Sequence, residues 1–258
     1  MDIDLLFNLY LALWLAIFGA VLGSFLCCAA DRGGLPTGRS RCDSCGHVLG
    51  VGELIPIFSY LFSQGHCRHC GAAIPARCLA AELVGAVGFA ALGMRFGPSL
   101  ELVMQLILAG LLLLLSLVDW NAHVLPDKLL LAIIVNRLVF LVLLREPLGE
   151  TLPQMALGAF SVSLPLLLLS LVMDWLLQKD TLGGGDIKLL FVLGLYLGWL
   201  EMLLLLIFAC ALALIWAIGP GRRQAKGEIP LGPFLAAGWL SVSLFGEPLI
   251  QWYLGLLG

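Results

Sequence analysis

Eight apolar runs, each near the length of a membrane crossing, dominate this sequence. A helix needs ~20 apolar residues to cross the hydrocarbon core of a bilayer. Hydrophobic residues make up 61% of the 258 residues and charged residues only 12%, as in integral membrane proteins. We therefore predict an all-α polytopic membrane protein with about eight transmembrane helices. The spans are expected at residues 5–28, 79–95, 101–118, 129–144, 152–177, 187–200, 202–219 and 231–255.

The charged residues indicate which partners to expect and how the spans are oriented. A net charge of −3 argues against nucleic acid, so the lipid bilayer is the first expected partner. With the N-terminus outside, two basic residues, Arg95 and Arg145, face that side, and Arg137 lies within a span. Cytoplasmic loops carry an excess of Lys and Arg, so the opposite side is predicted to be cytoplasmic. That side holds Arg32, Arg39, Arg41, Arg68, Arg77, Lys128, Lys179, Lys188, Arg222, Arg223 and Lys226.

One long polar segment interrupts the apolar runs and divides the chain into three predicted parts. Residues 1–30 form a first transmembrane helix, residues 31–78 form a cytoplasmic loop, and residues 79–258 form a transmembrane core. A loop of this size has few apolar residues with which to build its own core. We therefore expect another source of folding energy within the loop.

Two cysteine pairs in this loop predict a zinc site. Cys42 and Cys45 form the first pair, Cys67 and Cys70 form the second, and 21 residues separate the pairs. Two such pairs can supply four thiolates to a tetrahedral, structural zinc ion, which makes the segment a small zinc-ribbon-like loop. Redox or disulfide use of the pairs is the alternative, although the predicted cytoplasmic location disfavours disulfides.

The other four cysteines have less informative surroundings. Cys78 and Cys210 lie in or beside apolar spans, where a small buried core residue is a commoner role than a ligand. Cys27 and Cys28 end the first span, and we expect the same structural role for them. No pairing among these four cysteines is predicted.

Two aspartates stand at the edges of apolar runs, where a carboxylate is costly unless it has a function. Asp119 closes the run 111–118, and Asp186 follows three glycines and begins the run 187–200. Both lie at the predicted cytoplasmic ends of their spans. Two carboxyl groups that share a proton can activate a water molecule, so the pair predicts acid–base catalysis at the membrane surface.

The neighbouring polar residues have structural alternatives. Asp127 follows Pro126 at the start of a span, where a carboxylate commonly stabilises a helix N-terminus. Asp186 could cap its helix in the same way, although a cap does not require Gly183 and Gly185, which permit close approach of a backbone. Lys188 could hold a substrate carbonyl or contact lipid headgroups. We treat these residues as supporting candidates.

The motifs resemble those of the type IV prepilin peptidases, which are membrane aspartic proteases of the Gly-x-Gly-Asp type. The family's Gly-x-Gly-Asp motif corresponds to Gly183-Gly184-Gly185-Asp186, and its Asp-x7-Asp block corresponds to the segment from Asp119 to Asp127. The resemblance runs from about residue 20 to residue 240. Further matches are Gly23-Ser24-Phe25-Leu26, Arg32, Arg39-Ser40-Arg41-Cys42, Leu54-Ile55-Pro56, Ser59-Tyr60-Leu61, the second cysteine pair, Glu82 and Ile229-Pro230-Leu231-Gly232-Pro233-Phe234.

The resemblance implies an aspartyl protease of the bacterial cytoplasmic (inner) membrane with Asp119 and Asp186 as catalytic residues. Its expected reaction is removal of the basic leader peptide from type IV prepilins or type II secretion pseudopilins at the cytoplasmic face. Many members then methylate the new N-terminal residue with S-adenosylmethionine. No residues are predicted for that cofactor, because no glycine motif of the soluble methyltransferase type is visible.

Two positions depart from the family's pattern, and both lie in the part that the family associates with methyl transfer. Cys27 stands where Asn usually follows Gly-Ser-Phe-Leu, and Cys78 lies in the segment that usually reads Ser-x-Arg-Tyr-Pro. A peptidase without methyltransferase activity is therefore one alternative. A non-catalytic assembly factor that docks partners through the zinc loop is a second, and an ion-coupled transporter with membrane carboxylates is a third.

Overall fold

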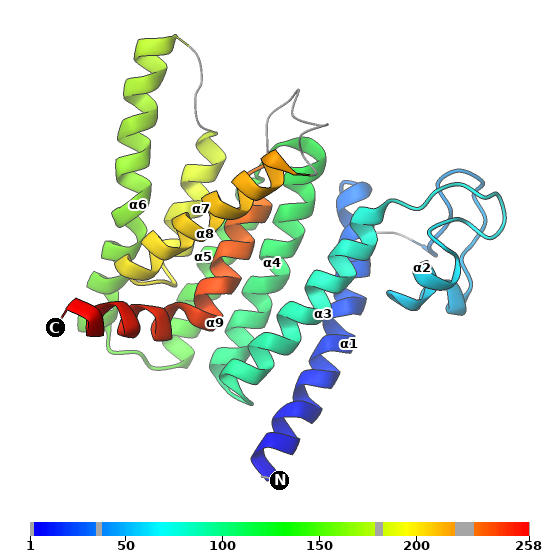
Figure 1. The fold of residues 1–258 in the computed structure, drawn as a ribbon, viewed down its shortest axis with the longest axis horizontal. Coiled ribbons are helices and arrows are strands. Elements are labelled where there is room, and N and C mark those ends of the chain that lie inside the picture. Colours follow the sequence, from blue (N-terminus) through cyan, green and yellow to red (C-terminus); the bar gives the residue numbers. More distant parts are fainter. Residues whose placement is uncertain (1–2, 35–37, 179–182, 220–229, 258) are drawn as a thin grey trace. The chain divides into compact units, whose positions relative to one another are not determined.

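The computed structural model describes residues 3–34, 38–178, 183–219 and 230–257, and every regular element in these ranges is a helix (Figure 1). The chain divides into two compact units, Met1–Leu102 and Val103–Gly258. The three-part division expected from sequence stays a prediction. The charges at Lys179, Arg222, Arg223 and Lys226, and Ile229 of the closing motif, lie outside the described residues.

The first unit is built on two long helices that pack side by side. Helices α1 (Ile3–Asp31) and α3 (Ala76–Phe96) run antiparallel (Figure 1). Small residues line their contact: a Cβ atom on Gly19 would meet the backbone of Gly85, and one on Gly23 would meet the backbone of Ala81. Backbones can approach this closely only where side chains are absent or minimal, which is a common way to pack helices in a membrane.

The polar loop between α1 and α3 holds two short helical segments, η1 (Val51–Glu53) and α2 (Phe58–Phe62). The backbone N–H of Ile57 donates a hydrogen bond of 2.6 Å to Oε2 of Glu82, a buried residue of α3. Ile57 has a φ angle of 64°, which is unusual for a β-branched residue. The buried carboxyl of α3 thus fixes the loop where its backbone is strained.

The described residues of the second unit form six helices, the first of which begins three residues before the unit boundary. Helix α8 packs along α9, and α6 packs along α7, where Gly158 and Gly194 bring the two backbones into contact. The helices are α4 (Leu100–Ala122), α5 (Asp127–Leu143), α6 (Leu148–Leu177), α7 (Gly184–Gly194), α8 (Trp199–Ile218) and α9 (Gly232–Leu257).

Each of the eight apolar runs coincides with a helix. Six of these helices are long and apolar enough to cross a membrane; the other two, α5 and α7, have 17 and 11 residues. Large apolar side chains are exposed along the outer surfaces of the helices, for example Phe7 and Trp175, as expected where lipid rather than water is the neighbour. The all-α membrane fold is confirmed, and the count of eight spans stays a prediction.

Candidate active site

Asp119 lies in the last turn of α4 and is buried, with 5% of its surface exposed. Its Oδ2 accepts a hydrogen bond of 2.9 Å from the backbone N–H of Gly232, the first residue of α9. A Cβ atom on Gly232 would lie 2.8 Å from that oxygen, so the glycine allows the backbone donor to reach the carboxylate. The carboxyl group of Asp119 is therefore held by a segment 113 residues further along the chain.

Asp186 lies in the first turn of α7 and is partly buried. Its backbone N–H bonds to the carbonyl oxygen of Gly183 at 3.0 Å. A Cβ atom on Gly183 would lie 2.9 Å from Oδ2 of Asp186, and one on Gly185 would lie 2.9 Å from Cδ1 of Leu125. These two glycines therefore leave room for the carboxyl group on one side and for the turn between α4 and α5 on the other.

The two aspartates belong to the same unit and are close enough for the charge of Asp119 to act on Asp186. Three helix ends meet around them: the end of α4, the start of α7 and, through Gly232, the start of α9. Two carboxyl groups in one partly desolvated place disfavour double ionisation, so such a pair tends to hold one proton between them. This arrangement can pair a general base with a general acid.

Asp127 and Lys188 form an ion pair beside these helix ends. Nζ of Lys188 lies 2.8 Å from Oδ1 of Asp127, and this ion pair joins the start of α5 to the second turn of α7. Both side chains are largely exposed, at 60% and 77%. Asp127 therefore has two structural roles. It places a carboxylate in the first turn of α5, and it pairs with Lys188 of α7.

A buried polar network that sequence reasoning missed holds the other end of α7. Nε of Arg137 donates to the carbonyl oxygen of Leu195 at 3.0 Å, while its two terminal nitrogens each lie 2.8 Å from a carboxylate oxygen of Glu146. Asn136 donates to the hydroxyl of Tyr196 at 2.9 Å. The position of Arg137 inside an apolar run was the one sign of this network in the sequence. Its partners could not be predicted, because they depend on how the helices pack.

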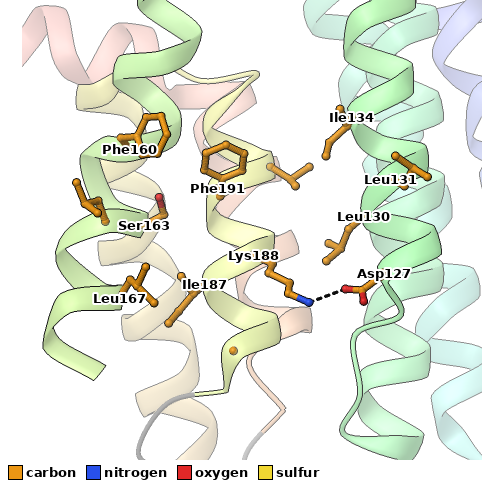
Figure 2. Close-up of a pocket in the computed structure, with 13 residues that line it drawn as sticks. Asp127, Leu130, Leu131, Ile134, Phe160, Ser163, Leu167, Ile187, Lys188 and Phe191 are labelled. Atoms are coloured by element: carbon orange, nitrogen blue, oxygen red, sulfur yellow. Dashed lines mark hydrogen bonds and ion pairs between the residues drawn. The ribbon is translucent and has the colours of Figure 1, made fainter. Parts of the chain in front are cut away.

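An apolar groove of about 600 Å³ lies against α7. Helices α5 and α6 flank it, and α7 lies between them (Figure 2). The rings of Phe160 and Phe191 pack edge to face, with centroids 5.2 Å apart, and the ion pair between Lys188 and Asp127 lies toward one end. Gly184, two residues before Asp186, also lines the groove.

The four loop cysteines come together in the first unit. The Sγ atoms of Cys42, Cys45, Cys67 and Cys70 all lie within 4.8 Å of one another, and those of Cys42 and Cys70 are 3.8 Å apart. Four thiolates at a Zn–S distance of ~2.3 Å in a tetrahedron would be separated by about 3.8 Å. The donor atoms therefore suit a tetrahedral metal ion such as zinc.

The two cysteine pairs form matched turns. In the first, the N–H of Cys42 bonds to the carbonyl of His47, and in the second the N–H of Cys67 bonds to that of Ala72. Gly46 and Gly71 follow the pairs with φ angles of 71° and 72°, which glycine adopts without strain.

The loop also favours a thiolate at one of its four sulfur atoms. Hydrogen bonds from the backbone of Cys45 and Ser44 lower the pKa of Cys42 to about 7. Despite a hydrogen bond from the backbone of Ala72, desolvation and the neighbouring thiols raise the pKa of Cys70 to about 11, so without a metal ion the cluster favours a thiolate at Cys42 and a protonated thiol at Cys70. Metal ligation requires deprotonated thiols, so binding of an ion would release protons from the cluster.

The surroundings of three of the remaining cysteines differ from expectation. Cys27 is buried, as expected of a small core residue, but the structure also joins Cys27 of α1 to Cys78 of α3 in a disulfide, which was not predicted. The reason is the close packing of α1 and α3, which no local pattern reports. Cys210 is exposed on α8, so the core position expected for it is also wrong, and Cys28 is a free cysteine beside Cys27.

Comparisons with known proteins identify the family. A model described as "Bacterial Peptidase A24 N-terminal domain" matches residues 17–96, and one described as "Type IV leader peptidase family" matches residues 106–218. No solved structure matches the chain.

Curated relatives match most of the chain, and each is named prepilin leader peptidase/N-methyltransferase. The protein from Bacillus subtilis is 34% identical over 93% of this chain and 96% of its own length. One from Aeromonas salmonicida is 34% identical over 88% of this chain and 78% of its own length. One from Myxococcus xanthus is 33% identical over 84% of this chain and 66% of its own length. The chain belongs to the type IV leader peptidase family of multi-pass inner-membrane enzymes.

Proposed function

We propose that this protein is a membrane aspartic endopeptidase that removes the basic leader peptide from type IV prepilins or type II secretion pseudopilins. The observation that carries the proposal is that two carboxyl groups, at the end of α4 and the start of α7, lie close enough for the charge of one to act on the other. Relatives that share most of the chain are named prepilin leader peptidases.

Asp119 and Asp186 are the proposed catalytic pair. The ionised aspartate removes a proton from a water molecule as its oxygen attacks the scissile carbonyl carbon, and the protonated aspartate donates its proton to the carbonyl oxygen. The tetrahedral intermediate then collapses and the C–N bond breaks. The carboxyl that accepted the water proton delivers it to the leaving amine, and the other aspartate takes back a proton from a hydroxyl of the intermediate as the new carboxyl group forms. The hydrogen bond from Gly232 keeps one carboxyl oriented throughout.

The groove along α7 suits the apolar stem of the substrate. Its walls are almost entirely apolar. It reaches Gly184 in the first turn of α7, where Asp186 also lies, and Lys188 at the start of the second turn. A stem helix in this groove would place the junction with the leader near the aspartates. The basic leader would then extend toward the predicted cytoplasmic side, which implies a periplasmic N-terminus for the enzyme.

We further propose that the protein methylates the new N-terminal residue. The N-terminal family model covers residues 17–96, and the relatives are named N-methyltransferases. S-adenosylmethionine would supply the methyl group. The four-cysteine site would hold zinc as a structural ion, because four protein ligands leave no open coordination position.

Product mass tests both activities in one reaction. Purified protein in detergent is incubated with a prepilin that carries a basic leader, with and without S-adenosylmethionine. We expect loss of the leader in both reactions and a gain of one methyl group, ~14 Da, only with the methyl donor. Asp186→Asn should abolish leader loss, while Asp174→Asn on α6 serves as the matched control. Intact prepilin with folded, zinc-loaded enzyme would overturn the peptidase proposal.

A further inference from the structure

Cys27 and Cys78 lie where the backbones of α1 and α3 suit a covalent bond. Their Cα atoms are 5.6 Å apart, and disulfides most often join Cα atoms separated by ~5.5–6 Å. Cys27 is almost completely buried, with 1% of its surface exposed, and Cys78 is half-buried. The separation of the two backbones is thus independent support for a pairing of these cysteines.

Helix packing places the two cysteines opposite each other. Gly19, Gly23 and Cys27 follow at intervals of four residues along one face of α1, and the first two contact Gly85 and Ala81 of α3. Cys78 lies one turn before Ala81 on α3, so it faces Cys27, which lies one turn after Gly23 on α1. Both cysteines therefore lie on helices that pack against each other, Cys27 on α1 and Cys78 on α3.

We propose that Cys27 and Cys78 form a redox-active dithiol that closes the base of the four-cysteine loop. The chain leaves α1 and returns in α3 at this point, and the adjacent pair Asp31 and Arg77 already bridges the two helices, with an N–O distance of 3.0 Å. The inference goes beyond peptidase activity and relies only on the proposed cytoplasmic side for its reduced resting state.

Oxidation by a small-molecule disulfide such as glutathione disulfide completes the chemistry. The more accessible Cys78 attacks as a thiolate, forms a mixed disulfide and releases one glutathione thiolate. Cys27 then loses its proton and attacks the Cys78 sulfur, which releases the second glutathione. The protein dithiol loses two electrons, and glutathione disulfide gains them to give two glutathione molecules.

Counting free thiols by intact mass tests the pairing. Zinc-loaded protein is incubated with glutathione disulfide or with dithiothreitol, then denatured and alkylated. Wild-type protein has eight cysteines, so we expect eight alkylations after reduction and six after oxidation. Cys78→Ala should show seven under both conditions. The neighbouring Cys28→Ala is the matched control, and it should change from seven to five.

Zinc content measured in the same samples separates this pair from the loop cysteines. Unchanged zinc with two protected thiols supports the proposal. Eight alkylations after oxidation, or protection that persists in Cys78→Ala, would overturn it. A second metal ion that disappears with Cys78→Ala would also overturn it, because Cys27, Asp31 and Cys78 could then be metal ligands.

The rate of zinc transfer to a chelator tests whether the bond closes the loop. We expect oxidised wild-type protein to release zinc several-fold more slowly than reduced protein, because the disulfide fixes both ends of the metal-binding segment. The double variant Cys27→Ala/Cys78→Ala should release zinc at one rate under both conditions. Equal rates for oxidised and reduced wild-type protein would refute the closing role.

Discussion

The backbone N–H of Gly232 donates a 2.9 Å hydrogen bond to Oδ2 of Asp119, which joins the start of α9 to the end of α4. This contact gives a physical reason for a glycine in the segment Leu231-Gly232-Pro233, because a Cβ atom there would lie 2.8 Å from the same oxygen. Helix α9 thus takes part in the proposed active site although it carries neither aspartate. Peptidase activity should depend on this backbone donor as well as on the carboxyl groups.

Replacing either aspartate by asparagine should remove peptidase activity. Asparagine keeps the size of the side chain but cannot exchange a proton, and acid–base catalysis contributes about 10²–10⁴-fold to rate. We expect Asp119→Asn and Asp186→Asn each to lower the single-turnover rate of leader release by at least ~10²-fold. Zinc content and the elution volume in size-exclusion chromatography should stay normal. Activity within twofold of wild type in either variant would contradict the proposed pair.

Gly232→Ala should lower activity without unfolding the protein. The added methyl group must displace either the Asp119 carboxyl or the start of α9, and a misplacement of about 1 Å can cost ~10²-fold in rate. We expect a fall in kcat of about ten- to a hundredfold. Gly255→Ala is the matched control on the same helix, because nothing lies within 4 Å of its added Cβ atom. Equal activity of the two variants would show that the Gly232 contact is dispensable.

The helical architecture could be predicted because its signals are local. Runs of apolar residues identify membrane helices by length and composition, and each predicted run coincides with a helix. The four-cysteine cluster was also predictable, since each pair forms its own turn and the two turns have matched hydrogen bonds. The positions of Asp119 and Asp186 at helix ends were likewise predictable, because each aspartate stands at the edge of an apolar run.

The contacts between distant segments could not be predicted in the same way. Hydrophobic periodicity does not report which helices pack together, so the bonds from Arg137 to Leu195 and from Gly232 to Asp119 had no local signal. Cys27 and Cys78 illustrate the same limit, because each looks like an ordinary small residue until α1 and α3 pack. Small residues on a helix allow another helix to pack closely, but they do not indicate which helix that is.

Loss of the Arg137 guanidinium should destabilise α7 and lower activity indirectly. Arg137 is buried and binds both Glu146 and the carbonyl of Leu195, so Arg137→Met leaves a partly buried carboxylate without its cation. Breaking a buried ion pair costs about 3–5 kcal/mol. Because the side chain of Glu146 is 23% exposed, we expect Arg137→Met to lower the free energy of unfolding by about 3 kcal/mol.

Unfolding by sodium dodecyl sulfate measures the cost of Arg137→Met. Arg145→Met is the control, because Arg145 directly precedes Glu146 in sequence but is exposed. Glu146→Gln in the Arg137→Met background should restore part of the lost stability, since it removes the uncompensated charge. Equal stability of the two arginine variants would contradict a structural role for Arg137.

The ion pair between Lys188 and Asp127 should matter for substrate binding more than for stability. Exposed pairs contribute about 0–1 kcal/mol, and both of these side chains are largely exposed. We expect Lys188→Ala and Asp127→Ala to leave the unfolding midpoint nearly unchanged. If Lys188 contacts the substrate beside the groove, Lys188→Ala should raise KM several-fold with little change in kcat, whereas Asp127→Ala should have a smaller effect. A fall in kcat alone would place Lys188 in the chemical step.

Removing the metal should separate the loop from the peptide-bond chemistry. Cys42→Ser eliminates one of four sulfur ligands, so we expect the zinc content measured by atomic emission to fall from about one ion per chain toward zero. Asp119 and Asp186 both belong to the unit Val103–Gly258, and the four cysteines belong to the other unit. Cleavage of a short peptide that spans the leader junction should therefore persist in the zinc-free protein. If the kcat for the short peptide falls in proportion to the zinc content, the loop acts in the chemical step. If only the cleavage of full-length prepilin is lost, the loop acts in substrate capture.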